Sequence, residues 1–233
     1  MNGGETDAIR LEGVNKSYGS GELRTQVLFD INLSFARGTF NSIIGASGSG
    51  KTTLLNIIGT LDRPDSGEVA IDGKSTWGMG RRELAALRNS TIGFIFQYHY
   101  LLPEFTVIEN VLMPRLIMGG PAEARARERA EALLELVGLG AVKGKLASKI
   151  SGGQQQRTAI ARALMNEPKI ILADEPTGNL DSENSAAVYR LFRRINRELG
   201  TTFVIVTHDR RIAEQTDRIV EIRDGRIGLD IRK

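Results

Sequence analysis

Residues Gly45 to Thr52 combine the residue types that bind a phosphate group. The stretch reads GASGSGKT, with glycines, a lysine and a hydroxyl side chain at close spacing. Glycines let backbone N–H groups turn toward an anion, and a helix that begins there adds the positive end of its dipole. A flexible turn without a ligand would not need Lys51 for the β and γ oxygens or Thr52 for Mg²⁺. The pattern predicts a nucleotide-binding loop of Gly45, Ala46, Ser47, Gly48, Ser49, Gly50, Lys51, Thr52 and Thr53.

Two adjacent carboxylates follow an apolar stretch in the second half of the chain. The segment KIILADEPTGNLD places Asp174 and Glu175 at its end. Neighbouring residues of an extended chain point in different directions, so one carboxylate can hold Mg²⁺ while the other approaches the γ-phosphate. We assign Asp174 to the metal and Glu175 to the attacking water. The alternative is an acidic strand end that only caps a turn before Pro176.

Two polar residues follow other apolar stretches. Gln97 ends FIFQ, and its amide is suited to orient Mg²⁺ or water, although an isolated glutamine carries little information. His208 follows residues 201–207 and is placed to contact a γ-phosphate. A lone histidine at a strand end is more often a solvated loop residue, so the residues alone leave both interpretations open.

A second glycine-rich helix start lies at residues 151–154, which read SGGQ. If Ser151 caps a helix that begins near Gly153, its hydroxyl, the glycine amides and the helix dipole form another anion site. This site has no lysine, and the phosphate loop already surrounds its own nucleotide. We therefore expect Ser151, Gly152, Gly153 and Gln154 to close the ATP bound by another copy of the chain. The alternative is an ordinary capped helix.

The surrounding pattern predicts an α/β core that positions these residues. Strand-like segments at 8–14, 27–35 and 67–73, bounded by Gly and Asp, suit a small antiparallel sheet. A strand at 40–45 precedes a helix at 51–61, and two further apolar strands lie at 169–175 and 201–209. Continuous apolar strands of this kind indicate a parallel sheet that is covered on both faces.

A mostly helical segment interrupts this core. Strand signals are missing between Gln97 and Pro168, and one predicted helix there opens at Pro121 and closes at Gly138. The predicted division is 1–96, 97–167 and 168–233, with the first and last parts forming one nucleotide-binding core. The helix places five apolar residues on one face: Ala126, Ala130, Leu133, Leu134 and Val137.

Composition excludes several other classes of protein. The 233 residues contain no cysteine, which rules out disulfides, thiolate metal sites and a cysteine nucleophile. The net charge of +3, without a basic cluster, gives no support for nucleic acid as a partner. No apolar run approaches eighteen residues, and the start MNGGETDAIR lacks the layout of a secretory signal, so we expect neither a membrane span nor export.

The order of five motifs resembles that of the ATP-binding cassette (ABC) ATPases along the whole chain. These motifs are the phosphate loop, Gln97, SGGQ, ILADEPTGNLD and His208. The resemblance implies a RecA-like P-loop NTPase core with an antiparallel β edge sheet and an inserted helical subdomain. It also implies that two copies bind ATP with Mg²⁺ between them and hydrolyse it to ADP and phosphate.

The resemblance implies roles for individual residues. Tyr18 would stack on adenine, Gln97 would join the core to the helical subdomain, and His208 would be the switch histidine. Leu180 and Asp181 resemble the loop that contacts the other copy. Ile150 departs from the usual leucine, a change that conserves volume. The implied catalytic residues are Glu175, His208 and Gln97, and the implied metal-binding residues are Thr52, Gln97 and Asp174.

Residues 96–114, FQYHYLLPEFTVIENVLMP, and the ADEPTGNLD stretch most resemble ATPase subunits of lipoprotein-releasing transporters. Relatives of that branch export macrolides or peptides or act in cell division. The resemblance implies a peripheral homodimer at the cytoplasmic face of the inner membrane. Integral membrane permease subunits would dock near Gln97 to Asn110, and no nucleic acid partner is expected. Alternatively, Leu101, Leu102 and Phe105 are simply core of the helical subdomain.

Three other classes fit less well. A soluble ABC ATPase of DNA repair or translation usually carries a long coiled-coil insertion or two cassettes, and neither is found in this sequence. A phosphate-loop kinase has no use for SGGQ. An inert nucleotide-binding subunit would not need Lys51, Asp174, Glu175 and His208 together.

Overall fold

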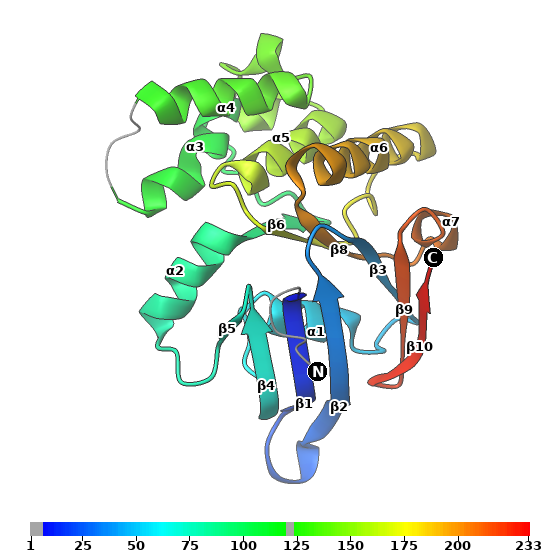
Figure 1. Ribbon diagram of the computed structural model, residues 1–233. Helices are drawn as coiled ribbons and strands as arrows, with labels where there is room; N and C mark the ends of the chain where they lie inside the picture. The colour runs from blue at the N-terminus through cyan, green and yellow to red at the C-terminus, as the bar shows by residue number, and fades with distance from the viewer. Residues whose placement is uncertain (1–6, 120–123) are drawn as a thin grey trace.

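A computed structural model describes residues 7–119 and 124–233. The first third of the chain builds the expected antiparallel sheet (Figure 1). Its strand order is β2-β1-β4-β5. The bounds are β1 (Asp7–Tyr18), a short turn η1 (Gly21–Leu23), β2 (Thr25–Ala36), β4 (Ser66–Ile71) and β5 (Lys74–Ser75).

The second sheet has six strands in the order β10-β9-β3-β8-β7-β6. Strands β6, β7, β8, β3 and β9 are parallel, and β10 pairs antiparallel with β9 at one edge. The parallel sheet was expected, because apolar runs that are buried on both faces suit it. Its strands are β3 (Phe40–Ile44), β6 (Ile92–Phe96), β7 (Ile170–Asp174), β8 (Thr202–Val206), β9 (Arg218–Arg223) and β10 (Arg226–Arg232).

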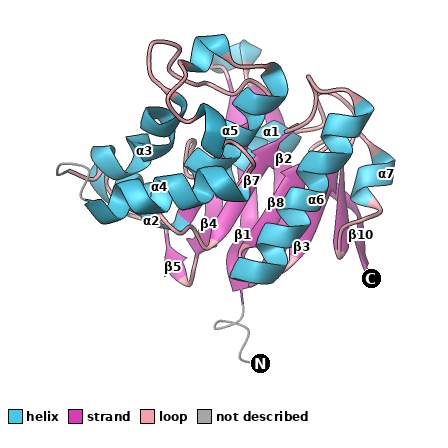
Figure 2. Cartoon of the chain, turned by 90° about the horizontal axis from the view of Figure 1, so that it is seen from above, coloured by secondary structure: helices cyan, strands magenta, loops and turns pink. Residues whose placement is uncertain are grey.

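Alternate residues of the central strands enter two different hydrophobic cores. Leu172 of β7 and Val204 of β8 pack in the core that contains helix α1 (Lys51–Ile58), between the two sheets. Their neighbours Ala173 and Phe203 enter the core on the other face. Figure 2 shows α5 (Gly152–Leu164) and α6 (Ser182–Leu199) lying over that face. The sheet therefore separates α1 from α5 and α6.

Helices and turns fill the chain between β6 and β7. They are α3 (Val107–Ile117), α4 (Ala124–Leu136), η2 (Gly140–Val142), η3 (Ala147–Lys149) and α5. The five apolar residues expected on one face of α4 and just beyond it are all buried. Gly138 closes that helix in the left-handed region at φ 71°, as expected, whereas Pro121 lies outside the described residues. The division at 96/97 and 167/168 stays a prediction.

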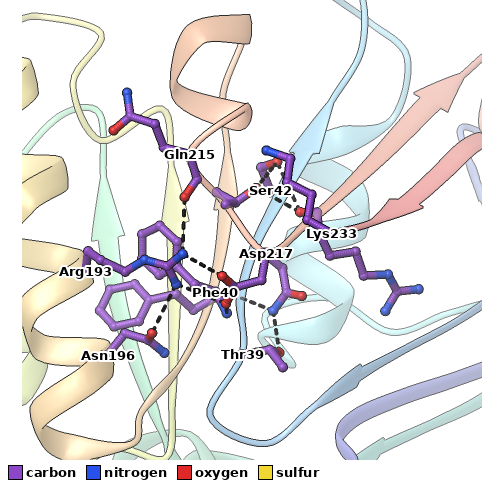
Figure 3. A network of polar contacts seen from close by, with 12 residues as sticks. Thr39, Phe40, Ser42, Arg193, Asn196, Gln215, Asp217 and Lys233 are labelled. Atoms are coloured by element: carbon purple, nitrogen blue, oxygen red, sulfur yellow. Dashed lines mark hydrogen bonds and ion pairs between the residues drawn. The ribbon is translucent and has the colours of Figure 1, made fainter.

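Polar contacts fix α6 at the amino edge of the second sheet (Figure 3). Arg193 of α6 donates from Nη1 to Asp217 Oδ2 at 3.0 Å, and the same carboxylate oxygen accepts from the Phe40 N–H. The Arg193 guanidinium also lies 4.7 Å from the centre of the Phe40 ring. Asn196 donates to the carbonyls of Gly38 and Thr201. These contacts stabilise the amino ends of the strands, at the edge of the sheet opposite to the one that carries the predicted site.

Several helices and strands were not predicted from the sequence. They are α2 (Arg81–Thr91), α6, α7 (Arg210–Ala213), β9 and β10. In the ranges 7–119 and 124–233, no helix is both long enough and apolar enough to cross a bilayer.

Candidate functional site

The phosphate loop connects β3 to α1, as predicted. Gly50 precedes α1 at φ 104° and Gly45 follows β3 at φ 151°, conformations that favour glycine. A Cβ atom at Gly45 would overlap the carbonyl oxygen of Ile222, so the backbone approaches its neighbour too closely for any side chain. Lys51 donates from Nζ to the carbonyls of Gly45 (3.0 Å) and Ala46 (2.8 Å). The lysine therefore lies over the loop whose ligand it is expected to contact.

Ser49 supports the fit of this loop to an anion. Its side chain is buried, and its hydroxyl oxygen has no hydrogen-bond partner in the structure. Buried polar atoms are nearly always paired, so an unpaired hydroxyl inside a glycine-rich loop marks a place where a phosphate oxygen fits.

Three neighbouring parallel strands end side by side next to the predicted catalytic residues. Phe96 pairs with Asp174, and Asp174 pairs with Val206. Gln97, Glu175 and His208 come within two residues of these positions, so residues far apart in sequence meet at one edge of the sheet. Ligands of open α/β sheets bind at this carboxyl edge.

Asp174 has the surroundings of a metal ligand. Burial raises the pKa of its carboxyl group, and the negative charge of Glu175 acts in the same direction. A hydrogen bond with Thr52 and the charge of Lys51 lower that pKa and partly compensate. A half-buried carboxylate beside a hydroxyl offers the hard oxygen ligands that Mg²⁺ takes, and the cation would relieve the cost of partly burying the charge.

Glu175 and His208 face one another at the mouth of the site. His208 Nδ1 lies 3.4 Å from Glu175 Oε2, with the histidine side chain 69% exposed and that of the glutamate 29%. Glu175 has φ 44°, a strained value for a residue other than glycine, and its N–H donates to the Val206 carbonyl at 3.0 Å. The strained backbone turns the carboxylate away from β7 and toward His208. The histidine is thus both exposed and in contact with the proposed base.

Gln97 contacts the loop that follows Glu175. Asn179 donates from Nδ2 to the Gln97 carbonyl at 3.1 Å. Gly178 lies so close that a Cβ atom there would be 2.7 Å from Gln97 Nε2. The roles of Gly178 and Asn179 were not predicted from the sequence, because their contact with Gln97 spans about eighty residues of chain.

Ser151 is the N-cap of α5, as expected. Its Oγ accepts from the Gln154 N–H at 3.3 Å, and Gln154 Oε1 accepts from the Ser151 N–H at 3.0 Å. Ser151 and Gly152 are exposed, and α5 packs on the face of the sheet opposite to α1 (Figure 1). Among the described residues no hydrogen bond joins residues 151–154 to the phosphate loop. The structure therefore does not bring these two predicted anion sites together within one chain.

Tyr18 is the last residue of β1 and is 43% exposed. Its hydroxyl donates to Asp62 Oδ2 at 2.7 Å, and Lys16 Nζ lies 5.0 Å from the centre of its ring. Asp181, next to Leu180 in the expected contact loop, caps α6 by accepting from the Asn184 N–H at 2.8 Å. Asp62 and Lys16 were not predicted from the sequence, because nothing in their local sequence indicates a contact with the tyrosine.

The segment after Gln97 presents aromatic side chains at the surface. Tyr98 and Tyr100 are 64% and 66% exposed, and Leu102 and Phe105 are also exposed. The alternative that Leu101, Leu102 and Phe105 are simply core residues is therefore wrong for Leu102 and Phe105, whereas Leu101 is half-buried. Arg162 of α5 donates to the carbonyls of His99 and Tyr100, both at 2.7 Å, and so attaches this segment to the helix that Ser151 caps.

The chain is similar to proteins of known class. The profile of the ABC transporter family matches residues 28–178. A Rhodopseudomonas palustris protein, lipoprotein-releasing system ATP-binding protein LolD 1, is 50% identical over 222 residues, which cover 95% of this chain and 98% of that protein. Macrolide export ATP-binding/permease protein MacB 1/2 of Paracoccus denitrificans is 53% identical over 224 residues, which cover 96% of this chain but 33% of that protein.

Solved structures are similar over almost the whole fold. The dimeric post-hydrolysis state of the ATP-binding cassette MJ0796, bound to ADP and Pi, matches with a TM-score of 0.88. It is 42% identical and covers 96% of this chain and 98% of that one.

Proposed function

This chain belongs to the ABC transporter family and is an ATP-hydrolysing subunit, and we propose that it drives the release of lipoproteins from the inner membrane. The observation that carries the proposal is the 50% identity with a lipoprotein-releasing ATPase over nearly the whole of both chains. The convergence of Gln97, Glu175 and His208 at one sheet edge supports hydrolysis as the source of energy.

The proposed reaction takes place beside the phosphate loop. Glu175 accepts a proton from water, and the water oxygen attacks the γ-phosphorus. The bond between the γ-phosphorus and the bridging oxygen breaks, and ADP leaves with that oxygen. Lys51 neutralises charge on the β and γ oxygens, and His208 contacts the γ-phosphate beside Glu175. Thr52, Asp174 and Gln97 would hold Mg²⁺, which supplies positive charge to the phosphate oxygens.

Two copies would bind two ATP molecules between them. The exposed Ser151 and Gly152 support this arrangement, because they lie on the opposite side of the sheet from their own α1. Each hydrogen bond from the Ser151–Gln154 stretch to the partner's γ-phosphate would be charge-assisted and worth about 1.5–3 kcal/mol. These bonds exist only with ATP, so ATP favours the closed dimer and hydrolysis releases it.

Membrane permease subunits would dock on the segment from Gln97 to Asn110. Exposed aromatic side chains are enriched at interfaces, and this segment contains Tyr98 and Tyr100. We place the subunit at the cytoplasmic face of the membrane, where ATP is available. The same three-part division, 1–96, 97–167 and 168–233, would let the helical part move with the permease. Macrolide export is the second candidate, because the MacB relative is 53% identical to this chain.

The first experiment tests hydrolysis and dimer formation with purified protein. Glu175→Gln should bind Mg-ATP, release phosphate at least about 100-fold more slowly and accumulate as a dimer. Lys51→Ala is the control, because it should bind ATP poorly and stay monomeric. A Glu175→Gln variant that hydrolyses like the unaltered protein would refute the catalytic assignment.

The second experiment identifies the transported cargo. Tagged Glu175→Gln is captured from native membranes with Mg-ATP, and the polypeptides bound to it are identified by mass spectrometry. Two related membrane subunits together with acylated protein would support lipoprotein release. Recovery of a macrolide or peptide exporter, or of a division protein, would change the proposed cargo but leave the assignment as an ATP-hydrolysing transporter subunit. Recovery of ribosomes or DNA alone would contradict the transporter assignment.

A further inference from the structure

Tyr18 is held by a carboxylate from a distant part of the chain. Asp62 lies in the loop at 59–65, which follows α1, and its Oδ2 accepts the Tyr18 hydroxyl at 2.7 Å. The two residues are 44 positions apart. A tyrosine at a strand end would otherwise rotate freely about χ1, so this bond selects one ring orientation.

The Asp62 carboxylate accepts three hydrogen bonds in this structure. Besides the tyrosine hydroxyl, it accepts Lys16 Nζ at 2.8 Å and the Arg63 N–H at 2.7 Å. Burial by itself would raise the pKa of Asp62, but hydrogen bonds from Lys16, Tyr18 and Arg63 lower it below its usual value. A charged acceptor makes a stronger bond to the hydroxyl than a neutral one.

Lys16 lies over one face of the Tyr18 ring. Its ammonium lies 5.0 Å from the ring centre and also donates to the Arg63 carbonyl at 2.7 Å, and the whole residue is 8% exposed. A cation in this position covers one face of the ring. The exposed part of the Tyr18 ring therefore remains available for stacking with a planar group.

The loop at 59–65 also links Tyr18 to the phosphate loop. It follows α1, which begins at Lys51, and Thr53 in the first turn of α1 is a polar neighbour of the Tyr18 hydroxyl. At the far end of the loop Asp65 accepts the Ser17 N–H at 2.8 Å. The ring and the phosphate loop are therefore attached to one continuous segment, residues 45–65.

We propose that Asp62 is a positioning residue that fixes the Tyr18 ring at a set distance from the phosphate loop, so that base and triphosphate bind together. This inference rests on the proposed function, in which Tyr18 stacks on adenine. Lys16 assists by neutralising Asp62 and covering the opposite face of the ring. The hydrogen-bond partners of the Asp62 carboxylate among the described residues are Lys16, Tyr18 and Arg63 and not the phosphate loop, so its effect should fall on nucleotide affinity and not on the chemical step.

The experiment compares two ligands by calorimetry. ATP carries a base and a triphosphate, whereas inorganic tripolyphosphate carries the phosphates alone. We expect Asp62→Ala to weaken ATP binding about five- to tenfold, which corresponds to about 1–1.4 kcal/mol. Tripolyphosphate should bind within about twofold of the unaltered protein, because the phosphate loop is unchanged. A loss that is equal for both ligands would mean that Asp62 is only a structural support, and would refute the proposal.

Three further variants complete the test. Asp62→Asn keeps an acceptor for the hydroxyl and should recover part of the affinity. Tyr18→Phe keeps the ring but loses the hydroxyl, and combining it with Asp62→Ala should add little. Glu68→Ala is the matched control, because the Glu68 side chain is exposed on β4, and its ATP affinity should stay within about twofold.

Steady-state kinetics separates this proposal from the function on which it rests. Asp62→Ala should raise KM about five- to tenfold and leave kcat within about twofold, because the reacting atoms lie at the other end of the nucleotide. A fall in kcat at unchanged KM would overturn the inference. Failure of the unaltered protein to hydrolyse ATP would instead overturn the proposed function, whereas full ATP affinity in Tyr18→Ala would overturn the inference alone, because Asp62 would then have no stacking ring to position.

Discussion

Replacing Ser151 by aspartate separates the two roles that this residue has in our interpretation. As an N-cap, aspartate is as good as serine, whereas an alanine would cost about 0.5–2 kcal/mol. The added charge also lies at the positive end of the α5 dipole, which favours it by about 0.3–1 kcal/mol. Ser151→Asp should therefore unfold at the same temperature as the unaltered protein or slightly above it.

The same substitution should prevent closure of the dimer. A carboxylate about 4 Å from the partner's γ-phosphate costs about 4 kcal/mol at an effective dielectric constant of about 20. That energy weakens closure about a thousandfold at each of the two sites. Phosphate release should fall to background, while ATP binding to the single chain stays within about twofold, because Ser151 lies away from its own phosphate loop.

The chain offers a matched control for this experiment. Thr106 caps α3 with the same reciprocal geometry, in which its hydroxyl accepts from the Glu109 N–H and Glu109 accepts from the Thr106 N–H. Thr106→Asp should keep phosphate release, but it should lower Tm, because the Thr106 hydroxyl donates to Glu109 Oε2 at 2.7 Å and an aspartate would place a second carboxylate there. Calorimetry measures ATP binding, thermal unfolding measures stability, and phosphate release is followed against protein concentration. Unchanged hydrolysis in Ser151→Asp, or loss of ATP binding to its monomer, would refute the reasoning.

Two further substitutions test the sheet edge. Burial raises the pKa of Asp174, so its charged form is costly in the folded chain, and Asp174→Asn should raise Tm at pH 7 without nucleotide or metal. This gain should shrink as pH falls and vanish below the unfolded pKa of about 3.9, where the carboxyl group is neutral in both states, and a gain independent of pH would contradict the cause given. Gly178→Ala should displace the Gln97 amide and lower kcat about tenfold at unchanged Tm. Gly144→Ala, where a Cβ meets nothing within 4 Å, is the control, and equal kcat in both variants would refute a role for Gln97.

Local sequence predicted the parts of the site that depend on one strand and the turn after it. The phosphate loop is such a unit, and so are Asp174 and Glu175 after β7. Gln97 and His208 each follow another apolar strand, and the structure brings them to the same edge, because parallel strands share one carboxyl edge. The roles of these residues stay predictions.

Contacts between distant side chains could not be predicted in this way. The bond from Tyr18 to Asp62 joins a strand end to a loop, and neither residue type indicates the other. The packing of Gly178 against Gln97 likewise depends on how two loops meet after the sheet has formed. The edge hairpin of β9 and β10 carries charged residues among its apolar ones, so it lacked the continuous pattern of the inner strands.

The position of β3 in its sheet has a consequence for synthesis of the chain. Its neighbours are β8 and β9. Phe40 pairs with Phe203, so β3 has no partner on its β8 side until the chain has been synthesised past Phe203. A ribosome adds roughly 5–20 residues each second, so the phosphate loop emerges many seconds before the strands that hold β3 in place. During this interval the nascent chain exposes the apolar residues of β3 and α1, and it acquires the ability to bind nucleotide only near the end of translation.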